Sequence, residues 1–316
     1  MAGQPSERDL LAPLLRRVFA SNVTQVERVT EGVSTKVYRV LAQDKTFYLR
    51  ILPEAGASFG PEVVAHERMR ALGVNAPEVV FYEPLYEPLQ RSVTIVTEIP
   101  GAPLSQSSHL DTRALDAIMV ETGRDLARIN SVQVDGFGWI ARAPGLQRLR
   151  APLSTNRAFM LEAWTADLAF LTDTATLRPK DVARLEQALA VHATWLDDGE
   201  SWLAHGDFDA TAVYQRDGAY TGVIDFGEMR GGSRWYDLAH FHMRDGEYLA
   251  ATLLPPLLHG YADVIPLAAD AERSIRFASL FINTRALSHS QRKRPPNRFT
   301  QHQVDVLRAD LAALCD

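Results

Sequence analysis

Apolar and polar positions alternate along much of the first hundred residues, and this pattern predicts a small β-sheet. The strand signals lie at residues 23–30, 37–41 and 46–52, in the extended segment that begins at Pro77, and at 92–99. Two helices are expected beside these strands. One follows the N-cap residue Ser6, and the other covers about residues 61–72, with Pro61 in its first turn.

The apolar spacing becomes mostly helical after the breaker Pro100-Gly101-Ala102-Pro103. The helical segments lie near residues 115–129, 157–172, 181–197, 235–243, 246–260, 269–289 and 299–314. We therefore predict an α+β chain with two lobes. The N-terminal lobe covers residues 1–100, and the larger, mostly helical C-terminal lobe covers residues 101–316.

A hairpin in the second half of the chain carries acidic residues. The short strand Trp202-Leu203 leads into a loop that holds Asp207, and the next two strands are joined by Asp217-Gly218, which is typical of a type I′ turn. The return strand ends at Asp225, so we expect this residue beside the loop of Asp207. Two neighbouring carboxylates suit a divalent cation and a proton acceptor, which phosphoryl transfer from a nucleotide requires.

Composition and charge narrow the classes of function. A formal net charge of −6 and an isoelectric point of about 5.9 give no electrostatic reason to expect nucleic acid, and they are compatible with a cationic small substrate. The single cysteine, Cys315, excludes an internal disulfide and a zinc site built from cysteines. The N-terminus carries charges where a signal peptide needs an apolar run, and no stretch approaches ~18 uninterrupted apolar residues. We expect a cytoplasmic protein without a membrane span.

The order of these elements and motifs resembles the aminoglycoside phosphotransferase / choline kinase-like family, and the resemblance covers nearly the whole chain. His205-Gly206-Asp207 resembles the catalytic loop of that family, and Ile224-Asp225-Phe226-Gly227 is similar to its metal-binding motif. The other matching segments are 96–101, 126–130, 136–138 and 231–239. The resemblance implies a bilobal protein-kinase-like fold, with an antiparallel sheet and a helix in the N-terminal lobe.

The resemblance also implies roles for the candidate site residues. Asp207 would be the catalytic base, and Asp225 would bind Mg²⁺, with ATP or GTP as the phosphate donor. Arg50 stands where the family usually has a strand lysine; it would contact phosphate and pair with Glu62, with Glu67 as the rival partner. The other candidate nucleotide-binding residues are Gly32, Ser34 and Thr35 in a small-residue loop, and Thr97, Glu98 and Ile99 in the segment that would receive the base.

Position 212 departs from the family pattern. The kinase pattern places an asparagine five residues after the catalytic aspartate, where it binds a second Mg²⁺, but this chain has Ala212 there. Alanine has no ligand atom, so Asp209 is our candidate for the second metal ligand. Ala212 indicates tolerance of one metal, an engineered change or lost activity.

Two neighbours of the catalytic loop are expected to be structural. His205 would hold the loop by hydrogen bonds rather than act as a general base. Asp237 would fix the loop rather than touch the substrate.

Three functions are compatible with these motifs. The first is an O-phosphotransferase for a small-molecule acceptor, whose ammonium groups could pair with acidic residues such as Asp167, Asp245 and Glu247. The second is a nucleotide-binding pseudokinase, because of Ala212. The third is metal-dependent hydrolysis of a phosphoester by aspartate and histidine. His240 and His242 weaken the third hypothesis, because residues two apart on a helix diverge. The protein would be a monomer or a dimer.

Overall fold

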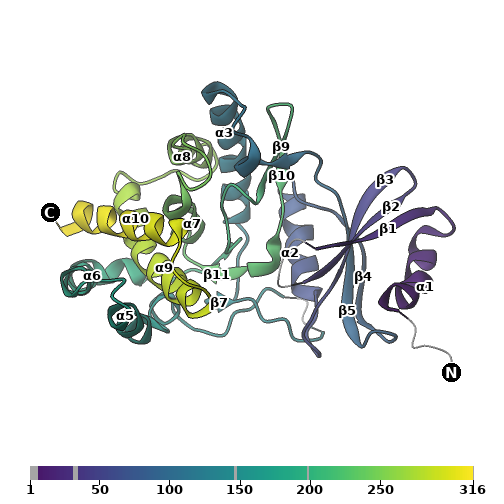
Figure 1. The fold of residues 1–316 in the computed structure, drawn as a ribbon, viewed down its shortest axis with the longest axis horizontal. Coiled ribbons are helices and arrows are strands. Elements are labelled where there is room, and N and C mark those ends of the chain that lie inside the picture. The colour runs from purple at the N-terminus through teal and green to yellow at the C-terminus, as the bar shows by residue number, and fades with distance from the viewer. Residues whose placement is uncertain (1–5, 31–34, 146–147, 198, 316) are drawn as a thin grey trace. The chain divides into compact units, whose positions relative to one another are not determined.

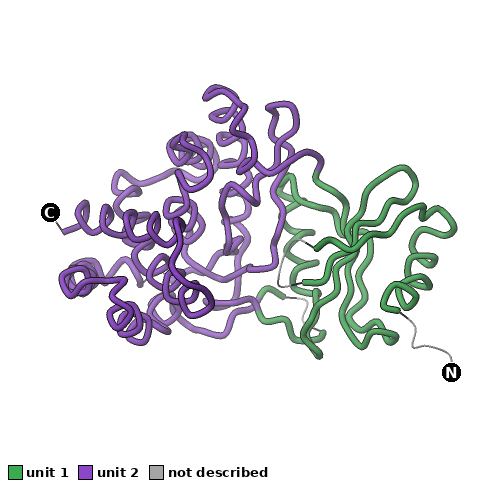
Figure 2. Tube along the Cα trace, viewed as in Figure 1, with its two compact units in different colours: residues 1–99, 141–149 green, residues 100–140, 150–316 purple. Residues whose placement is uncertain are grey.

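The computed structural model describes residues 6–30, 35–145, 148–197 and 199–315 of the 316-residue chain. The chain forms two compact units, shown in different colours in Figure 2. The first comprises residues 1–99 with 141–149, and the second comprises residues 100–140 with 150–316. In the described part of the chain, no helix combines the length and apolar character that a membrane crossing requires.

The first unit contains an antiparallel five-stranded sheet in the order β1-β2-β3-β5-β4 (Figure 1). Its strands are β1 (Val23–Val29), β2 (Lys36–Ala42), β3 (Lys45–Ile51), β4 (Val79–Tyr86) and β5 (Arg91–Thr97). Helix α1 (Glu7–Phe19) begins with a capping box between Ser6 and Asp9, and α2 (Gly60–Ala71) has a proline in its first turn. All seven elements predicted for this part of the chain are therefore present.

The period of two along β3 assigns its residues to two faces of the sheet. Phe47, Leu49 and Ile51 are buried and belong to one apolar core with Leu14 of α1. Helix α2 lies on the other side of the sheet from α1 (Figure 1), and Arg50 of β3 pairs with a residue of α2. The alternation thus gives one face to the core and leaves the other face for a charged side chain.

The second unit is mostly helical, and among the residues that the structure describes its strands are short and form two small three-stranded sheets. Its α-helices are α3 (Thr112–Ile129), α4 (Asn156–Met160), α5 (Trp164–Asp173), α6 (Pro179–His192), α7 (Trp235–Arg244), α8 (Leu254–Ala262), α9 (Ala271–Lys293) and α10 (Arg298–Cys315). Together with the antiparallel sheet of the first unit, this confirms the predicted α+β, protein-kinase-like fold class.

Two predicted helices have different bounds in the structure. The segment 157–172 is two helices separated by a turn at residues 161–163. The prediction for 246–260 is wrong in its first half, because Gly246 has a φ of 84°, which no α-helix contains. Asp245 accepts the backbone N–H groups of Leu253 and Leu254 at 3.0 Å, and α8 begins only there.

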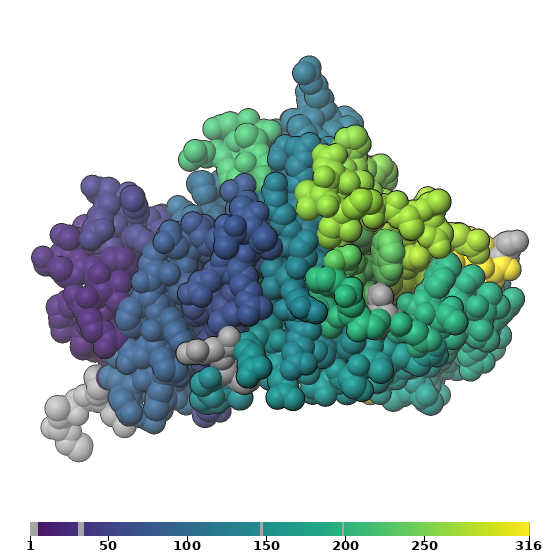
Figure 3. Space-filling view, turned by 180° about the vertical axis from the view of Figure 1, so that it is seen from behind, coloured from purple at the N-terminus to yellow at the C-terminus, as the bar shows by residue number. Residues whose placement is uncertain are grey.

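Helices α3 and α8 lie side by side in Figures 1 and 3, and two glycines make this close contact possible. A Cβ atom at Gly123 would lie 2.1 Å from the carbonyl oxygen of Leu257, and one at Gly260 would lie 1.8 Å from that of Val120. Any larger residue at these two positions would force the helices apart.

Short strands surround the segment with the acidic hairpin. β8 (Trp202–Ala204) pairs with β11 (Arg230–Gly232), which also pairs with β7 (Gly138–Trp139). β9 (Val213–Arg216) and β10 (Ala219–Val223) form the expected hairpin, and β9 also pairs with β6 (Ala102–Pro103). Asp217 and Gly218 both have positive φ angles, 54° and 77°, as a type I′ turn requires. The sequence signal for this turn is therefore correct.

Candidate active site

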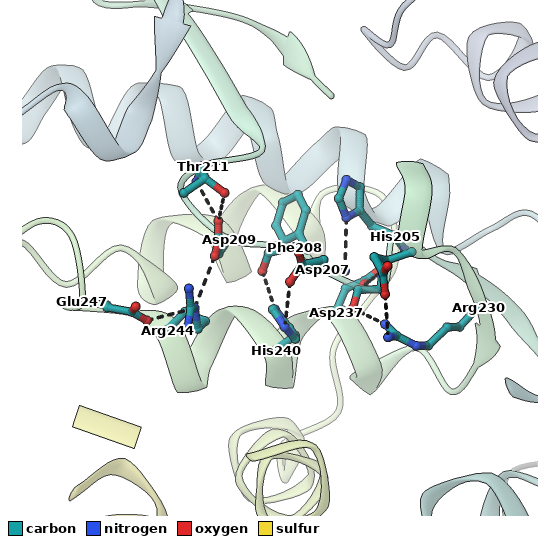
Figure 4. A network of polar contacts seen from close by, with 12 residues as sticks. His205, Asp207, Phe208, Asp209, Thr211, Arg230, Asp237, His240, Arg244 and Glu247 are labelled. Atoms are coloured by element: carbon teal, nitrogen blue, oxygen red, sulfur yellow. Dashed lines mark hydrogen bonds and ion pairs between the residues drawn. The ribbon is translucent and has the colours of Figure 1, made fainter. Parts of the chain in front are cut away.

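The loop after β8 is held in place by a buried carboxylate. Asp237, in the first turn of α7, is fully buried and accepts the backbone N–H groups of His205 at 2.8 Å and Gly206 at 2.9 Å (Figure 4). It also accepts a hydrogen bond from the side-chain amide of Asn130 at 3.0 Å. These bonds to a charged acceptor fix the backbone immediately before Asp207. Asp237 therefore has the loop-fixing role that the sequence predicted.

His205 links the same loop to the end of β10. Its Nε2 lies 2.8 Å from the carbonyl oxygen of Ile224, which can only accept, so Nε2 carries the proton. Its Nδ1 then accepts the backbone N–H of Asp207 at 3.4 Å. The ring is completely buried against Phe208 and Phe226. His205 is thus structural, as predicted, and it ties the loop of Asp207 to the residue before Asp225.

Arg230 supports the loop from β11, the strand that pairs with β8. Its guanidinium donates to the carbonyl oxygen of Gly206 and stacks on Trp139 and Tyr236, at 4.0 and 5.2 Å from the ring centroids. Gly206 has a φ of 91°, and a Cβ atom there would lie 1.8 Å from the carbonyl oxygen of Glu228. Only glycine fits at this point of the loop.

Asp207 and Asp225 both present their side chains to solvent. The side chain of Asp207 is 59% exposed, although its neighbours on both sides are buried. Asp225 is exposed as well and adopts a left-handed backbone conformation, with φ 67° and ψ 60°. A non-glycine residue in this conformation is uncommon, and such residues occur often at functional sites. The two segments that carry these carboxylates are joined by the hydrogen bond from His205 to Ile224.

Asp209 is buried and already has partners. Its carboxylate accepts the backbone N–H of Thr211 at 2.7 Å and the hydroxyl of Thr211 at 2.5 Å, and it pairs with Arg244 at 3.3 Å (Figure 4). Metal binding by Asp209 would therefore require the release of Arg244, and it stays a prediction. Within the described ranges, no three or more His, Cys, Asp or Glu residues are grouped so that they could hold a metal ion.

Arg244 also pairs with Glu247 at 2.9 Å, and the side chain of Glu247 is almost completely buried. Burial raises the pKa of Glu247 to about 7, even though the cation beside it favours the charged form. Asp245 accepts backbone N–H groups at the start of α8, and Asp167 is buried. The three acidic residues considered for an ammonium group are thus engaged or buried in this structure.

Arg50 and Glu62 form an ion pair in the first unit. The guanidinium is 13% exposed and the carboxylate 5% exposed, and Arg50 also lies over the ring of Phe59 at 5.1 Å. Glu67, the alternative partner, is exposed. The pair joins β3 to α2 and keeps a cation in a fixed position on the polar face of the sheet.

The other predicted nucleotide-binding residues differ in how far the structure describes them. Gly32 and Ser34 lie outside the described residues, and Thr35 is half-buried just before β2. Thr97 accepts the backbone N–H of Glu78 on its hydroxyl at 2.9 Å, and Glu98 donates its backbone N–H to Thr46 at 3.3 Å. Ile99 is half-buried.

The sequence reasoning missed two charged residues that contact the loop, and it considered a third residue, His240, only as a possible metal ligand. Arg230 and Arg244 reach it from later elements, and no local pattern announces such long-range pairs. His240 lies 3.4 Å from Asp207 by its Nε2 atom. This contact could have been found, because residues three apart on a helix share a face, and Asp237 was already predicted to fix the loop.

Comparison with known proteins identifies the class of protein. Residues 25–278 match the family described as the phosphotransferase enzyme family, so the chain belongs to that family and is a phosphotransferase. No curated protein sequence matches the chain at a significant level.

Solved structures share the fold of this chain. A thermostable mutant of aminoglycoside phosphotransferase APH(4)-Ia, in a ternary complex with ADP and hygromycin B, is 19% identical with a TM-score of 0.69 over 95% of this chain and 97% of that chain. Macrolide 2'-phosphotransferase MphH from Brachybacterium faecium is 16% identical with a TM-score of 0.58, over 95% and 98%. ADP-bound aminoglycoside phosphotransferase APH(2'')-Ib is 14% identical with a TM-score of 0.60, over 98% and 99%. The predicted family resemblance is confirmed.

Proposed function

We propose that the protein transfers the γ-phosphate of ATP or GTP to a hydroxyl group of a small-molecule acceptor. The observation that carries this proposal is the exposed Asp207 on a loop whose backbone is held from three sides, by Asp237, His205 and Arg230. A general base must reach the proton that it accepts, and a fixed backbone holds the base in position.

The reaction that suits this loop is an in-line displacement at phosphorus. The acceptor oxygen forms a bond to the γ-phosphorus as the bond from that phosphorus to the β,γ-bridging oxygen breaks. The bridging oxygen leaves with the electron pair as part of the nucleoside diphosphate, and the hydroxyl proton passes to the carboxylate of Asp207. The products are a phosphomonoester and ADP or GDP. Positioning and charge neutralisation account for most of the rate enhancement in such reactions.

Asp225 is the proposed ligand for Mg²⁺. Its carboxylate is exposed, and Mg²⁺ binds carboxylate oxygens together with phosphates and water rather than in a full cage of side chains. When bound, the cation would neutralise charge on the β- and γ-phosphates. Ala212 cannot contribute a ligand, and Asp209 holds Arg244, so Asp225 would act with few other ligands from the chain.

Arg50 is the proposed phosphate contact in the first unit, and Glu62 orients it. An arginine that is paired on one side retains further N–H donors for a phosphate. Gly32, Ser34 and Thr35 would contribute a loop over the phosphates, and residues 97–99 would contact the base through their backbone.

The proposed acceptor is an aminoglycoside-like or other small polyol. The relatives described above include an enzyme bound to hygromycin B and a macrolide 2'-phosphotransferase, so the acceptors tested should include both chemistries. Asp245 and Glu247, two of the residues considered for an ammonium group, are engaged within the chain. Neutral hydroxyl compounds therefore belong in the same test.

The alternative function is a nucleotide-binding pseudokinase, and the observation that favours it is Ala212. An acceptor panel of aminoglycosides, macrolides, choline, homoserine and sugars, assayed with MgATP and MgGTP for release of nucleoside diphosphate, separates the two. Nucleotide-induced thermal stabilisation with transfer to an acceptor, lost in Asp207→Asn, supports the kinase. Stabilisation without any transfer supports the pseudokinase. Phosphoester hydrolysis without nucleotide supports a hydrolase. If nucleotide causes no stabilisation and no phosphate is transferred, both nucleotide-dependent functions are rejected.

A further inference from the structure

His240 projects from α7 toward the loop that carries the proposed base. It lies three residues after Asp237, so the two side chains share the face of α7 that meets this loop (Figure 4). The ring is 7% exposed, and its Nδ1 lies 3.0 Å from the backbone carbonyl oxygen of Phe208. A carbonyl oxygen only accepts, so Nδ1 carries a proton and donates it. This bond fixes the plane of the ring.

The other ring nitrogen faces Asp207. Nε2 lies 3.4 Å from Oδ1 of Asp207, whose side chain is otherwise largely exposed. Because Nδ1 already carries a proton, Nε2 donates to this carboxylate only when the ring is doubly protonated. Burial lowers the pKa of His240, and the neighbouring carboxylate of Asp207 opposes that shift. The backbone of this loop is held by Asp237, His205 and Arg230, but those contacts leave the carboxylate free to rotate about its side-chain bonds. In the described part of the chain, His240 contacts this carboxylate and limits its rotation.

We propose that His240 is a positioning residue for the phosphotransfer reaction: in its doubly protonated form it donates from Nε2 to Oδ1, which sets the orientation of the Asp207 carboxylate and leaves Oδ2 for the hydroxyl of the acceptor. The inference rests on the proposed role of Asp207 as the base. A base that samples several orientations is productive for only part of the time, so a fixed orientation raises kcat without adding to ground-state binding.

A purely structural role for His240 would give a different result. A core histidine that only binds the carbonyl of Phe208 would affect stability and leave the turnover of folded enzyme unchanged. His242 provides the matched control, because it lies on the same helix but bonds to Asp310 at 2.8 Å, away from the loop. A substitution at His242 therefore perturbs α7 without removing a contact to Asp207.

Two near-isosteric substitutions separate the two ring nitrogens. In His240→Asn the amide takes the position of Nδ1 and keeps the bond to Phe208, but it cannot reach Asp207. In His240→Gln the longer side chain reaches Asp207 and loses the bond to Phe208. We expect His240→Asn to fold and to bind nucleotide as the parent does, with kcat lowered about 10- to 100-fold and the acceptor KM changed less than threefold. His240→Gln should recover part of kcat with a lower melting temperature.

The kinetic test compares kcat, acceptor KM and melting temperature for His240→Asn, His240→Gln and His242→Asn. A kcat of His240→Asn equal to that of the parent overturns the proposal. A loss of kcat in His242→Asn as large as that in His240→Asn also overturns it, because the effect would then come from α7 as a whole.

A measurement without turnover separates this proposal from the proposed function. In the protein labelled with ¹⁵N-histidine, Asp207→Asn should move the Nε2 resonance of His240 and leave its Nδ1 resonance nearly unchanged. If the Nε2 resonance of His240 does not move in folded Asp207→Asn, the positioning role is overturned. This result holds even if the His240 variants do not fold. If the Nε2 resonance moves but the parent protein phosphorylates no acceptor, the contact between His240 and Asp207 is supported. The proposed phosphotransfer function is then rejected instead.

Discussion

Ile224 donates its backbone N–H to the carbonyl oxygen of Ala212 at 3.0 Å. The residue that lacks a metal ligand is thus bonded directly to the residue before Asp225. The backbone N–H of Ala212 is also engaged, because it donates to the carbonyl oxygen of Asp209 at 3.1 Å. Position 212 is therefore held beside the segment that carries the proposed metal ligand, and it is the position at which a side-chain ligand can be introduced as a test.

Ala212→Asn should lower the Mg²⁺ concentration needed for half-maximal rate and raise kcat. One lost electrostatic contact to a transferring phosphoryl group costs roughly 10²–10³ in rate, which bounds the gain. The measurement is a Mg²⁺ titration of phosphotransfer. Ala210→Asn is the control, since it places the same amide at another buried alanine of the loop. A folded, nucleotide-binding Ala212→Asn that is no faster than the parent would exclude the metal site as the limiting defect.

The fold of the first unit could be predicted because its strand segments are rich in β-branched and aromatic residues and because the period of two is regular in β2 and β3. The start of α8 could not, because it depends on the side chain of Asp245 reaching residues 253 and 254. The membership of residues 141–149 in the first unit was also not predicted. It involves a backbone bond from Ser58 to Arg142 at 2.7 Å, which no local pattern encodes.

The candidate site was predictable where its residues belong to one motif and unpredictable where partners are distant. The hairpin placed Asp207 near Asp225, and the family resemblance pointed to both residues and to Asp237; Glu62 was named as the partner of Arg50. The ion pair of Asp209 with Arg244 depends on α7, because Arg244 lies 35 residues later in the chain. Propensity and spacing contain no information about that pair.

Arg50→Lys should weaken nucleotide binding by about 10-fold, because lysine keeps the charge but loses the planar set of donors. Arg50→Ala is less informative, since it would leave the buried Glu62 unpaired and destabilise the first unit. The measurement is the nucleotide dependence of the melting temperature. Arg91→Lys is the control, because Arg91 lies in β5 and donates to the carbonyl of Pro53. Equal affinities for parent and Arg50→Lys would reject the phosphate contact.

Gly206→Ala should destabilise the second unit by at least about 2 kcal/mol and lower activity. The φ of 91° is unfavourable for alanine, and the new methyl group would collide with the carbonyl of Glu228. Gly199→Ala is the matched control, since a Cβ atom there meets no neighbour within 4 Å. Denaturant unfolding and initial rates for both variants check the expectation. Similar behaviour of the two variants would mean that the loop relaxes easily around residue 206.

Asp181→Asn should reduce stability at neutral pH and have little effect near pH 2. Hydrogen bonds from Arg178, and further contacts from Arg308 of α10, lower the pKa of Asp181 to about 2 from an ordinary value of 3.8. The ionised group therefore stabilises the folded state above about pH 4, by about 2 kcal/mol, and this contribution disappears as the pH falls from 4 to 2. Urea unfolding of parent and variant between pH 2 and 7 measures the difference. Asp173→Asn, at an exposed position of α5, controls for the loss of one charge.

Asp237→Asn should lower both the stability of the second unit and the rate of phosphotransfer. The carboxylate accepts hydrogen bonds on both oxygens, from Gly206 on Oδ1 and from His205 and Asn130 on Oδ2. An asparagine side chain has only one acceptor oxygen, so its NH₂ group would face at least one backbone donor. The loss of a buried bond to a charged acceptor, together with an unpaired donor, costs about 2–4 kcal/mol.

The kinetic effect of Asp237→Asn should follow from displacement of the loop, so kcat should fall by more than the unfolded fraction alone explains. Nucleotide-induced stabilisation through Arg50 should change far less, because Asp237 contacts the loop of Asp207 and not β3. Asp263→Asn neutralises a half-exposed aspartate paired with Arg124 and serves as the control for charge. If Asp237→Asn unfolds at the same urea concentration as Asp263→Asn and retains the parental kcat, the backbone of residues 205–206 does not depend on this carboxylate. The loop would then be fixed by His205 and Arg230 alone.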